Sequence, residues 1–188
     1  MPIKQEIHKT IITLQKGKTI LYPTDTVWGI GCDATDENAV NNVYSIKNRT
    51  ESKSMIILVD SLEMLQKIIL DIPSHILDIV KKSKRPTSYI FHNPKGLAKN
   101  VVAKDNTVAI RIVNDSFCQQ LIHDFGKPIV STSANISSKS TPKTFSEIQT
   151  EITDNVDYIV DLHREKQNSK SSSVVKILKD GTLNVLRK

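Results

Sequence analysis

The feature that most constrains the fold is a pair of β-like runs that closes a chain whose earlier segments alternate between helical and strand patterns. The runs 173–179 and 182–187 flank Asp180-Gly181, where a glycine that tolerates positive φ favours a tight hairpin turn. Alternating helices and strands are typical of α/β sheets, but a closing hairpin cannot belong to a wholly parallel sheet. We therefore predict an α/β fold with one twisted, mixed parallel and antiparallel sheet flanked by helices.

The other elements follow from apolar spacing and from capping residues. Ile7, Ile11 and Leu14 form one helical stripe that ends at Gly17. Further helices are predicted after four caps or starts: Asp36, Ser61, Pro73-Ser74, and Asp115 or Ser116, the last of them ending at Gly126. Strands are predicted at 19–22, 54–59, 88–91, 107–113 and 129–131. Thr144 and Glu147 have capping-box spacing, which predicts one more short helix.

Length and composition limit the organisation of the chain. With 188 residues, of which 38% are hydrophobic, we expect one core and a single domain over 1–188. No stretch approaches the roughly 18 apolar residues that a membrane helix needs, and the opening MPIKQEIHKT lacks the apolar run of a signal peptide. We therefore expect a cytoplasmic protein that does not contact a membrane.

Charge and metal-binding residues carry less information. The net charge of +6 suits phosphate-bearing substrates or nucleic acid, but it also suits a solubilising surface. Cys32 and Cys118 are far apart, and we expect both to be reduced and buried. The five histidines are scattered without ligand spacing, so we expect no permanent metal site built by the protein.

Three polar clusters lie at predicted strand or helix ends, where α/β sheets build their sites. The loop 23–31 (PTDTVWGIG) offers two threonine hydroxyls and an aspartate, the segment 47–49 places Lys and Arg near Lys53, and 131–137 (STSANIS) offers hydroxyls and an amide. Each has a plain alternative: a Pro/Gly turn, cations that complement a helix dipole, and ordinary loop chemistry. The functional interpretation of 47–49 is a phosphate clamp. None of the three is a P-loop, a Rossmann glycine motif or a nucleophile elbow.

Taken in order, PTDTVWGIG, the K-x-R of Lys47 and Arg49, VAIRI around Arg111 and STSANIS resemble the YrdC-like family of threonylcarbamoyl-AMP synthases over nearly the whole chain. The most specific part is K-x-R followed far downstream by the S-x-N of Ser133 and Asn135. The resemblance implies the short, single-domain form of this family, with an α/β fold whose positively charged concave face holds ATP and threonine.

The resemblance also implies a role for individual residues. The catalytic residues would be Lys47 and Arg49. The ATP-binding residues would be Lys47, Arg49, Ser133, Asn135, Ser173 and Arg187. The threonine-binding residues would be Thr24, Thr26, Arg111, Ser131 and Thr132. The chain departs from the family pattern at 84–88, where KRPTS stands in place of W-P-G-P-x-T, and at Ser138, where relatives carry glycine.

The implied activity is that of a nucleotidyltransferase that forms threonylcarbamoyl-AMP and pyrophosphate from L-threonine, bicarbonate or CO2, and ATP. The amine of threonine would capture CO2, and the carbamate would attack the α-phosphate, so that no protein nucleophile is needed. Mg²⁺ would be carried in with ATP. The product would pass to a separate tRNA threonylcarbamoyl transferase complex.

Two rival interpretations remain open. One is a paralogue of the same fold that binds RNA in rRNA or ribosome maturation, and direct contact with tRNA is compatible with the basic charge. Its weakness is an aromatic content of 5% without the aromatic and basic interleaving of single-strand platforms. The other is carbamoyl transfer, as in the related domain of hydrogenase maturation factors, which also carry zinc-finger and acylphosphatase parts that this chain lacks.

Overall fold

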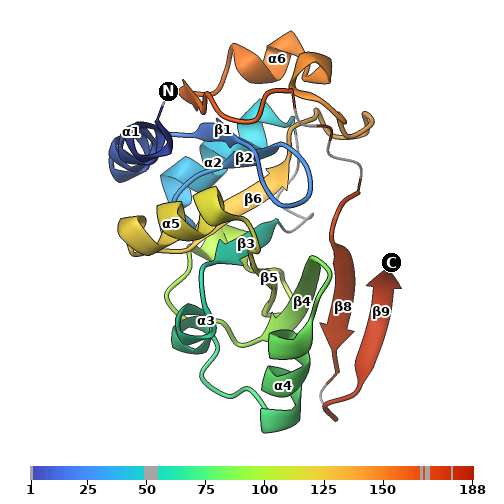
Figure 1. Ribbon diagram of the computed structural model, residues 1–188. Helices are drawn as coiled ribbons and strands as arrows, with labels where there is room; N and C mark the ends of the chain where they lie inside the picture. Colours follow the sequence, from blue (N-terminus) through green and yellow to red (C-terminus); the bar gives the residue numbers. More distant parts are fainter. Residues whose placement is uncertain (1, 49–54, 166, 168–169, 179) are drawn as a thin grey trace.

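The strands of the protein form one mixed sheet. The computed structural model describes residues 2–48, 55–165, 167, 170–178 and 180–188. Within them the sheet has nine strands in the order β7-β1-β2-β6-β3-β5-β4-β8-β9 (Figure 1). The strands are β1 Ile20–Tyr22, β2 Gly29–Gly31, β3 Ile56–Val59, β4 Thr87–His92, β5 Thr107–Ile112, β6 Ile129–Ser133, β7 Tyr158–Ile159, β8 Ser173–Ile177 and β9 Leu183–Arg187.

The pairing of the strands confirms the predicted mixture. β1–β7, β3–β5 and β4–β8 are parallel, whereas β1–β2, β2–β6, β3–β6, β4–β5 and β8–β9 are antiparallel. The closing hairpin of β8 and β9 forms as predicted, with Gly181 at a φ of 81° in its turn. It occupies one edge of the sheet, and the ribbon places it on the far side of the molecule from α1 (Figure 1).

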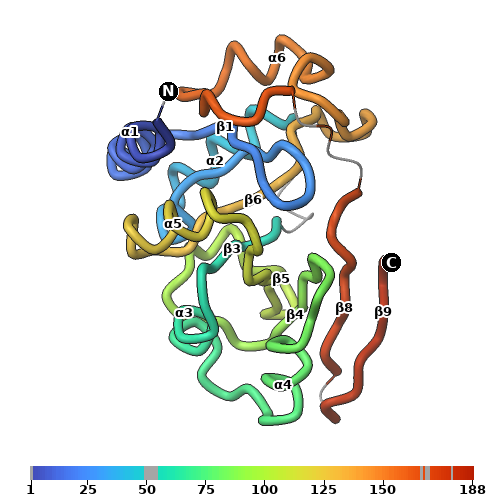
Figure 2. Tube along the Cα trace, in the orientation of Figure 1, coloured from blue at the N-terminus to red at the C-terminus, as the bar shows by residue number. Residues whose placement is uncertain are grey.

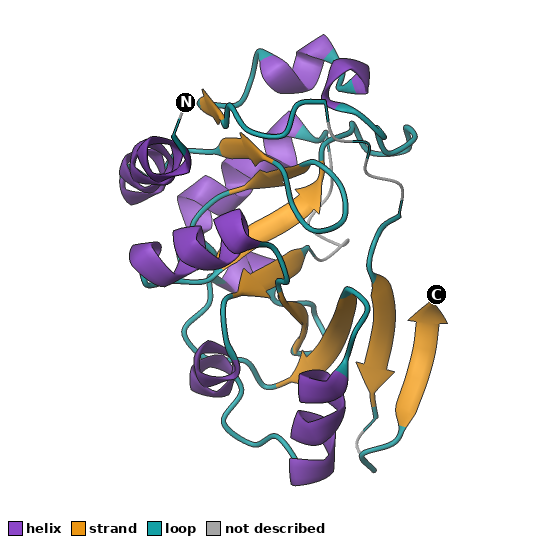
Figure 3. Ribbon diagram, in the orientation of Figure 1, coloured by secondary structure: helices purple, strands orange, loops and turns teal. Residues whose placement is uncertain are grey.

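The four helices for which a cap or start was predicted begin there, whereas the short helix at Thr150–Thr153 was not predicted. The helices are α1 Ile3–Gln15, α2 Glu37–Ile46, α3 Leu62–Ile68, α4 Ser74–Lys82, α5 Ser116–Phe125 and α6 Thr150–Thr153, with single 3-10 turns at Lys99–Val101 and Phe145–Glu147. Asp36 accepts hydrogen bonds from the first-turn N–H groups of α2, Ser61 caps α3, and Asp115 rather than Ser116 caps α5. Figure 3 shows these helices in purple against the orange strands.

Two predictions about local structure were wrong. The segment after Thr144 is a 3-10 turn without a capping box, because the Glu147 carboxylate accepts from the backbone N–H of Lys143 at 2.7 Å and the Thr144 hydroxyl pairs with Ser146 at 3.0 Å. The loop 23–31 ends in a strand, β2. The glycines of β2 allow close strand packing, since a Cβ at Gly31 would lie 2.6 Å from the carbonyl oxygen of Val130.

The apolar core forms two clusters. One lies beneath α1 and α5 and includes Leu14, Tyr22 and Phe117. The larger cluster includes Trp28, whose ring lies 4.9 Å from that of Phe145 between centroids. Cys32 and Cys118 are buried and free, as expected. Within the described part of the chain, no helix is long and apolar enough to cross a membrane.

Candidate active site

Most of the predicted site residues surround one cavity over the middle of the sheet. The cavity has a volume of about 250 Å³. Five parts of the chain supply its polar lining: the β1–β2 loop, β5, β6, the segment that precedes β8, and β9. In that order, the residues are Thr26; Arg111; Ser131, Thr132 and Ser133; Ser171 and Ser172; and Arg187. A second hollow of about 980 Å³ shares Thr26, Ser171 and Arg187 with it and extends to Arg85 and Lys188. The two hollows therefore form one cleft.

The loop between β1 and β2 forms one wall through a chain of hydroxyls. Figure 2 shows this loop in blue, projecting from β1 toward the middle of the molecule. The Thr24 hydroxyl donates to the carbonyl oxygen of Val27 at 2.8 Å and lies 3.0 Å from the Thr26 hydroxyl. Because Thr24 has used its one proton on Val27, Thr26 is the donor within the hydroxyl pair. Thr24 and Thr26 are both buried, so their hydroxyls shape the loop.

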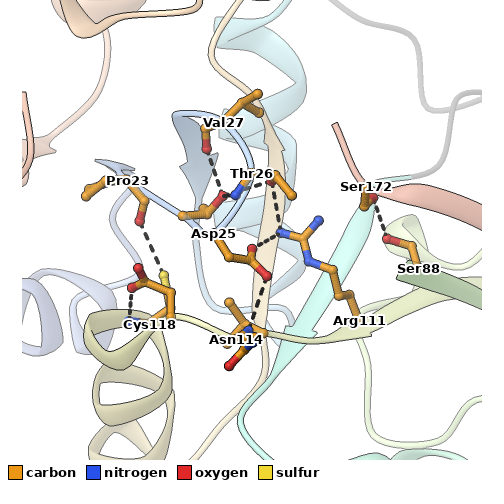
Figure 4. A network of polar contacts seen from close by, with 12 residues as sticks. Pro23, Asp25, Thr26, Val27, Ser88, Arg111, Asn114, Cys118 and Ser172 are labelled. Atoms are coloured by element: carbon orange, nitrogen blue, oxygen red, sulfur yellow. Dashed lines mark hydrogen bonds and ion pairs between the residues drawn. The ribbon is translucent and has the colours of Figure 1, made fainter. Parts of the chain in front are cut away.

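A buried ion pair fastens the same loop to β5. Arg111 donates from Nη2 to Asp25 Oδ1 at 2.9 Å and to the Thr26 hydroxyl at 3.3 Å (Figure 4). The other Asp25 oxygen accepts from the backbone N–H of Asn114 at 3.2 Å. The side chains of Arg111 and Asp25 are only 3% and 6% exposed, so the charge of each depends on the other for compensation. Asp25 therefore holds the guanidinium against the cavity wall.

Lys47 contacts the loop after β6 directly, so there is no room for a ligand between its ammonium and the Ser133 and Asn135 carbonyls. Lys47 follows α2 and is 1% exposed. Its Nζ donates to the carbonyl oxygens of Ser133 and, at 2.7 Å, Asn135, while its own carbonyl accepts from the N–H of Ser137 at 2.9 Å. A buried ammonium needs such acceptors, which explains why it lies beneath the loop. Arg49, the other predicted cation, lies outside the described residues.

The predicted amide also organises the loop backbone. Asn135 is 8% exposed, and its Nδ2 donates to the carbonyl oxygens of Ile136 at 3.0 Å and Lys139 at 2.9 Å. Ser133 lies at the end of β6 and lines the cavity. Lys47 and Asn135 therefore both stabilise the segment after β6 by donating hydrogen bonds to its carbonyl oxygens. Ser131, Thr132 and Ser133 line the cavity.

Arg187 approaches the cavity from the last strand. Its Nε donates to the carbonyl oxygen of Ser172 at 2.9 Å. Burial and the nearby positive charge of Arg111 lower the pKa of Arg187. Ser173, predicted to bind ATP, lines the larger hollow at the start of β8. The sequence did not single out Ser172, because a serine run is typical of a flexible loop and does not show which hydroxyl turns inward.

The cleft carries an excess of positive charge. Its lining includes five cationic side chains, namely Arg85, Arg111, Lys170, Arg187 and Lys188. Asp25 is the one carboxylate among the described lining residues, and Arg111 already pairs with it. Such a cleft favours anionic ligands. Among the residues that the structure describes, no group of three or more His, Cys, Asp or Glu could hold a metal ion.

Known proteins are similar to this chain in sequence and in fold. A threonylcarbamoyl-AMP synthase from Pseudoalteromonas translucida is 33% identical over 164 residues, which cover 86% of this chain and 88% of the relative. Another, from Photobacterium profundum, is 29% identical over 160 residues, covering 82% and 85%. The structure of P. abyssi Sua5 complexed with L-threonine superposes with a TM-score of 0.85 at 25% identity. That match covers 96% of this chain but 53% of the Sua5 chain, so this chain spans about half its length.

The family comparison extends over almost the whole chain. The model of the Sua5/YciO/YrdC family, described as telomere recombination, matches residues 13–188. The matched region contains every residue that we assign to the cleft. From its sequence, its fold and the arrangement of its cleft, this chain belongs to the Sua5/YciO/YrdC family.

Proposed function

We propose that this protein is an L-threonylcarbamoyladenylate synthase, a nucleotidyltransferase that makes threonylcarbamoyl-AMP and pyrophosphate from L-threonine, bicarbonate or CO2, and ATP. The observation that carries the proposal is the convergence of Arg111 and Arg187 on one cavity lined by the hydroxyls of β6. The names of the two bacterial relatives support the reaction, and the Sua5 complex with L-threonine supports the amino-acid substrate.

The cleft suits a reaction between two anions. When the threonine amine attacks CO2, it loses a proton and becomes a carbamate. A carbamate oxygen then forms a bond to the α-phosphorus of ATP, and the bond from that phosphorus to the bridging oxygen breaks, which releases pyrophosphate. The protein has to hold the two substrates in line and balance the negative charge, which fixed cations and hydroxyl donors do without a protein nucleophile.

The polar side chains divide between the two substrates. We assign threonine to the wall formed by Thr26, Arg111, Ser131 and Thr132, where the Arg111 guanidinium can face its carboxylate. Thr24 supports this wall through its contact with the Thr26 hydroxyl. We assign the nucleotide to Ser133, Ser173 and Arg187, which line the cleft. Asn135 belongs to the same site through the loop that it orders after Ser133. Lys47 adds positive charge directly under Ser133, and we assign Arg49 to the phosphates with it.

Magnesium would accompany ATP. The one carboxylate in the lining of the described cleft, Asp25, is occupied by Arg111, so the side chains present suit an ion that is held by phosphate oxygens and water. Bound in that way, Mg²⁺ would neutralise phosphate charge. We further propose that the product is handed to a tRNA threonylcarbamoyl transferase complex in the cytoplasm, where it supplies the threonylcarbamoyl group of tRNA.

The substrate requirement of pyrophosphate release tests the proposal. The purified protein with ATP and Mg²⁺ should release pyrophosphate only when both threonine and bicarbonate are present. Serine and glycine should substitute poorly, because serine lacks the methyl group of threonine and glycine lacks its whole side chain. Release that is equal with any amino acid, or that needs none, would contradict a synthase of this kind.

A further inference from the structure

Two serine hydroxyls form a buried pair beside the guanidinium of Arg187. Ser88 lies in β4 and is 0% exposed, and Ser172 directly precedes β8 and is 2% exposed. Their Oγ atoms are 2.9 Å apart, and Figure 4 shows the two side chains turned toward each other. The Ser172 carbonyl accepts from Arg187 Nε at 2.9 Å, and its Oγ lies 3.5 Å from Nη2. Ser172 therefore joins β4 to the cation on β9.

The Oγ atom of Ser172 links Ser88 to Arg187. A guanidinium only donates, so Ser172 Oγ acts as an acceptor toward Arg187. The same Oγ keeps its bond to Ser88, whichever of the two hydroxyls donates it. Ser88 lies outside the lining of the cleft, whereas Ser172 and Arg187 are part of it. Any effect of Ser88 on a ligand must then pass through Ser172.

Among the residues that the structure describes, the charge of Arg187 has no opposite charge to hold it in place. The other arginine that lines the same cavity, Arg111, carries a charge of the same sign. Asp25 compensates Arg111, whereas no ion pair with a carboxylate holds Arg187 within the described chain. An unsupported arginine would turn toward solvent, where water stabilises its charge. The contacts with Ser172 keep it at the cavity, which leaves its charge for an anion.

We propose that Ser88 and Ser172 are positioning residues that hold the Arg187 guanidinium in the cleft, ready to bind an anionic group of the nucleotide. The inference rests on the proposed function, in which Arg187 contacts ATP. It assigns a role in substrate binding to a buried residue of β4 that touches no substrate. It also makes the docking of the last strand a part of the binding site.

A double-mutant cycle on ATP binding tests this inference. The dissociation constant for ATP is measured by calorimetry, without threonine or bicarbonate, for wild type, Ser88→Ala, Arg187→Met and the double variant. Ser88→Ala should raise it roughly threefold to tenfold, as expected for the loss of one hydrogen bond, and Arg187→Met by about tenfold or more. In the Arg187→Met background, Ser88→Ala should add nothing, because the residue through which it acts is gone.

Two further variants keep the result decisive. Ser172→Ala breaks the same hydroxyl pair from the other side and replaces Ser88→Ala if that variant does not fold. Thr10→Val is the matched control, because Thr10 is also 0% exposed and loses a 2.6 Å bond to the Glu6 carbonyl in α1, away from the cleft. It should leave the dissociation constant unchanged.

The outcomes separate this inference from the proposed function. Equal effects of Ser88→Ala with and without Arg187, or no effect in either background, would overturn the positioning role even if pyrophosphate release requires threonine. Conversely, a coupled cycle in a protein that releases no threonine-dependent pyrophosphate would support the positioning role and overturn the synthase. Failure of the wild-type protein to bind ATP would overturn both.

Discussion

The ammonium of Lys47 donates a 2.7 Å hydrogen bond to the carbonyl oxygen of Asn135, which lies 88 residues further along the chain. The same ammonium also donates to the carbonyl oxygen of Ser133, so one buried cation contacts both ends of the S-x-N motif. Two motifs that the sequence only places in order are thus in direct contact. The conformation of the loop that follows β6, and of the hydroxyls it presents, depends on this charge.

Lys47→Met should therefore damage both stability and activity. The variant leaves two buried carbonyl groups without their charged donor, and the free energy of unfolding should fall by about 3 kcal/mol. The rate of pyrophosphate release should fall on the order of 10², as for other removed electrostatic donors. Urea unfolding and a pyrophosphate assay measure the two effects. Lys82→Met removes an exposed lysine from α4 and should change neither; an equal response of both variants would refute a special role for Lys47.

The ion pair of Asp25 and Arg111 should show strong coupling. Asp25→Ala leaves a buried guanidinium without its counter-charge, and should cost about 3 to 5 kcal/mol of unfolding free energy. Arg111→Met should cost a similar amount. In the double variant no buried charge is left uncompensated, so it should be more stable than the sum of the single losses predicts. Urea unfolding of the four proteins measures the coupling, and strictly additive losses would contradict a buried, mutually dependent pair.

The two glycines of β2 should respond differently to alanine. A Cβ at Gly31 would lie 2.6 Å from Val130 O and 2.7 Å from a ring carbon of Tyr22, so Gly31→Ala should lower the free energy of unfolding by about 2 kcal/mol. At Gly29 the new Cβ would lie 3.2 Å from the Ser131 hydroxyl. Gly29→Ala should therefore mainly raise KM for threonine. Thermal unfolding and steady-state kinetics distinguish the two, and the reverse pattern would argue against Ser131 as part of the threonine wall.

Asp157 should make the protein sensitive to acid. Burial would raise the pKa of Asp157, but hydrogen bonds from the N–H and hydroxyl of Thr19, both 2.8 Å, and the charge of Lys18 outweigh burial and lower it below 3.8. A carboxyl whose pKa is lowered by folding stabilises the folded protein at pH values above the pKa of the unfolded chain. This stabilisation is lost as the pH falls through the pKa of the folded protein. Asp157→Asn should therefore flatten the fall in urea midpoint between about pH 5 and about pH 2.

The matched control for this pH dependence is Asp78→Asn, which removes an exposed carboxylate from α4. Its urea midpoint should follow the wild-type curve at every pH. If Asp157→Asn also follows the wild-type curve, the contact between Asp157 and Thr19 does not contribute to the acid sensitivity. The comparison needs no activity measurement, so it tests the structure of this sheet edge independently of function.

Local signals in the sequence were enough for most of the fold. Asp36, Ser61 and Asp115 cap the predicted helices, and the hairpin around Gly181 forms, because both depend on neighbouring residues. The strands β2 and β7 were missed, since each is only two or three residues long and its pairing comes from distant strands. The failed capping box at Thr144 shows the same limit, as Glu147 finds a different N–H once the turn is packed.

The candidate site was predictable only as a set of motifs. K-x-R and S-x-N indicate which residues matter, and Lys47 does meet Ser133 and Asn135. Their spacing does not show that the ammonium lies beneath the loop, because that depends on how the end of α2 is placed relative to the loop after β6 in the folded chain. The contribution of Ser88 was equally hidden, since a lone serine in a strand pattern reveals its hydrogen-bond partner only when β4 pairs with β8.

The most direct test of the central claim is to identify the product by mass spectrometry after incubation with ATP, Mg²⁺, L-threonine and isotopically labelled bicarbonate. We predict an adenylate that contains one threonine and carries the label in its carbamoyl carbon, formed together with pyrophosphate. If pyrophosphate appears without such an adenylate, or if the adenylate forms without the label, this cleft does not join threonine, bicarbonate and ATP.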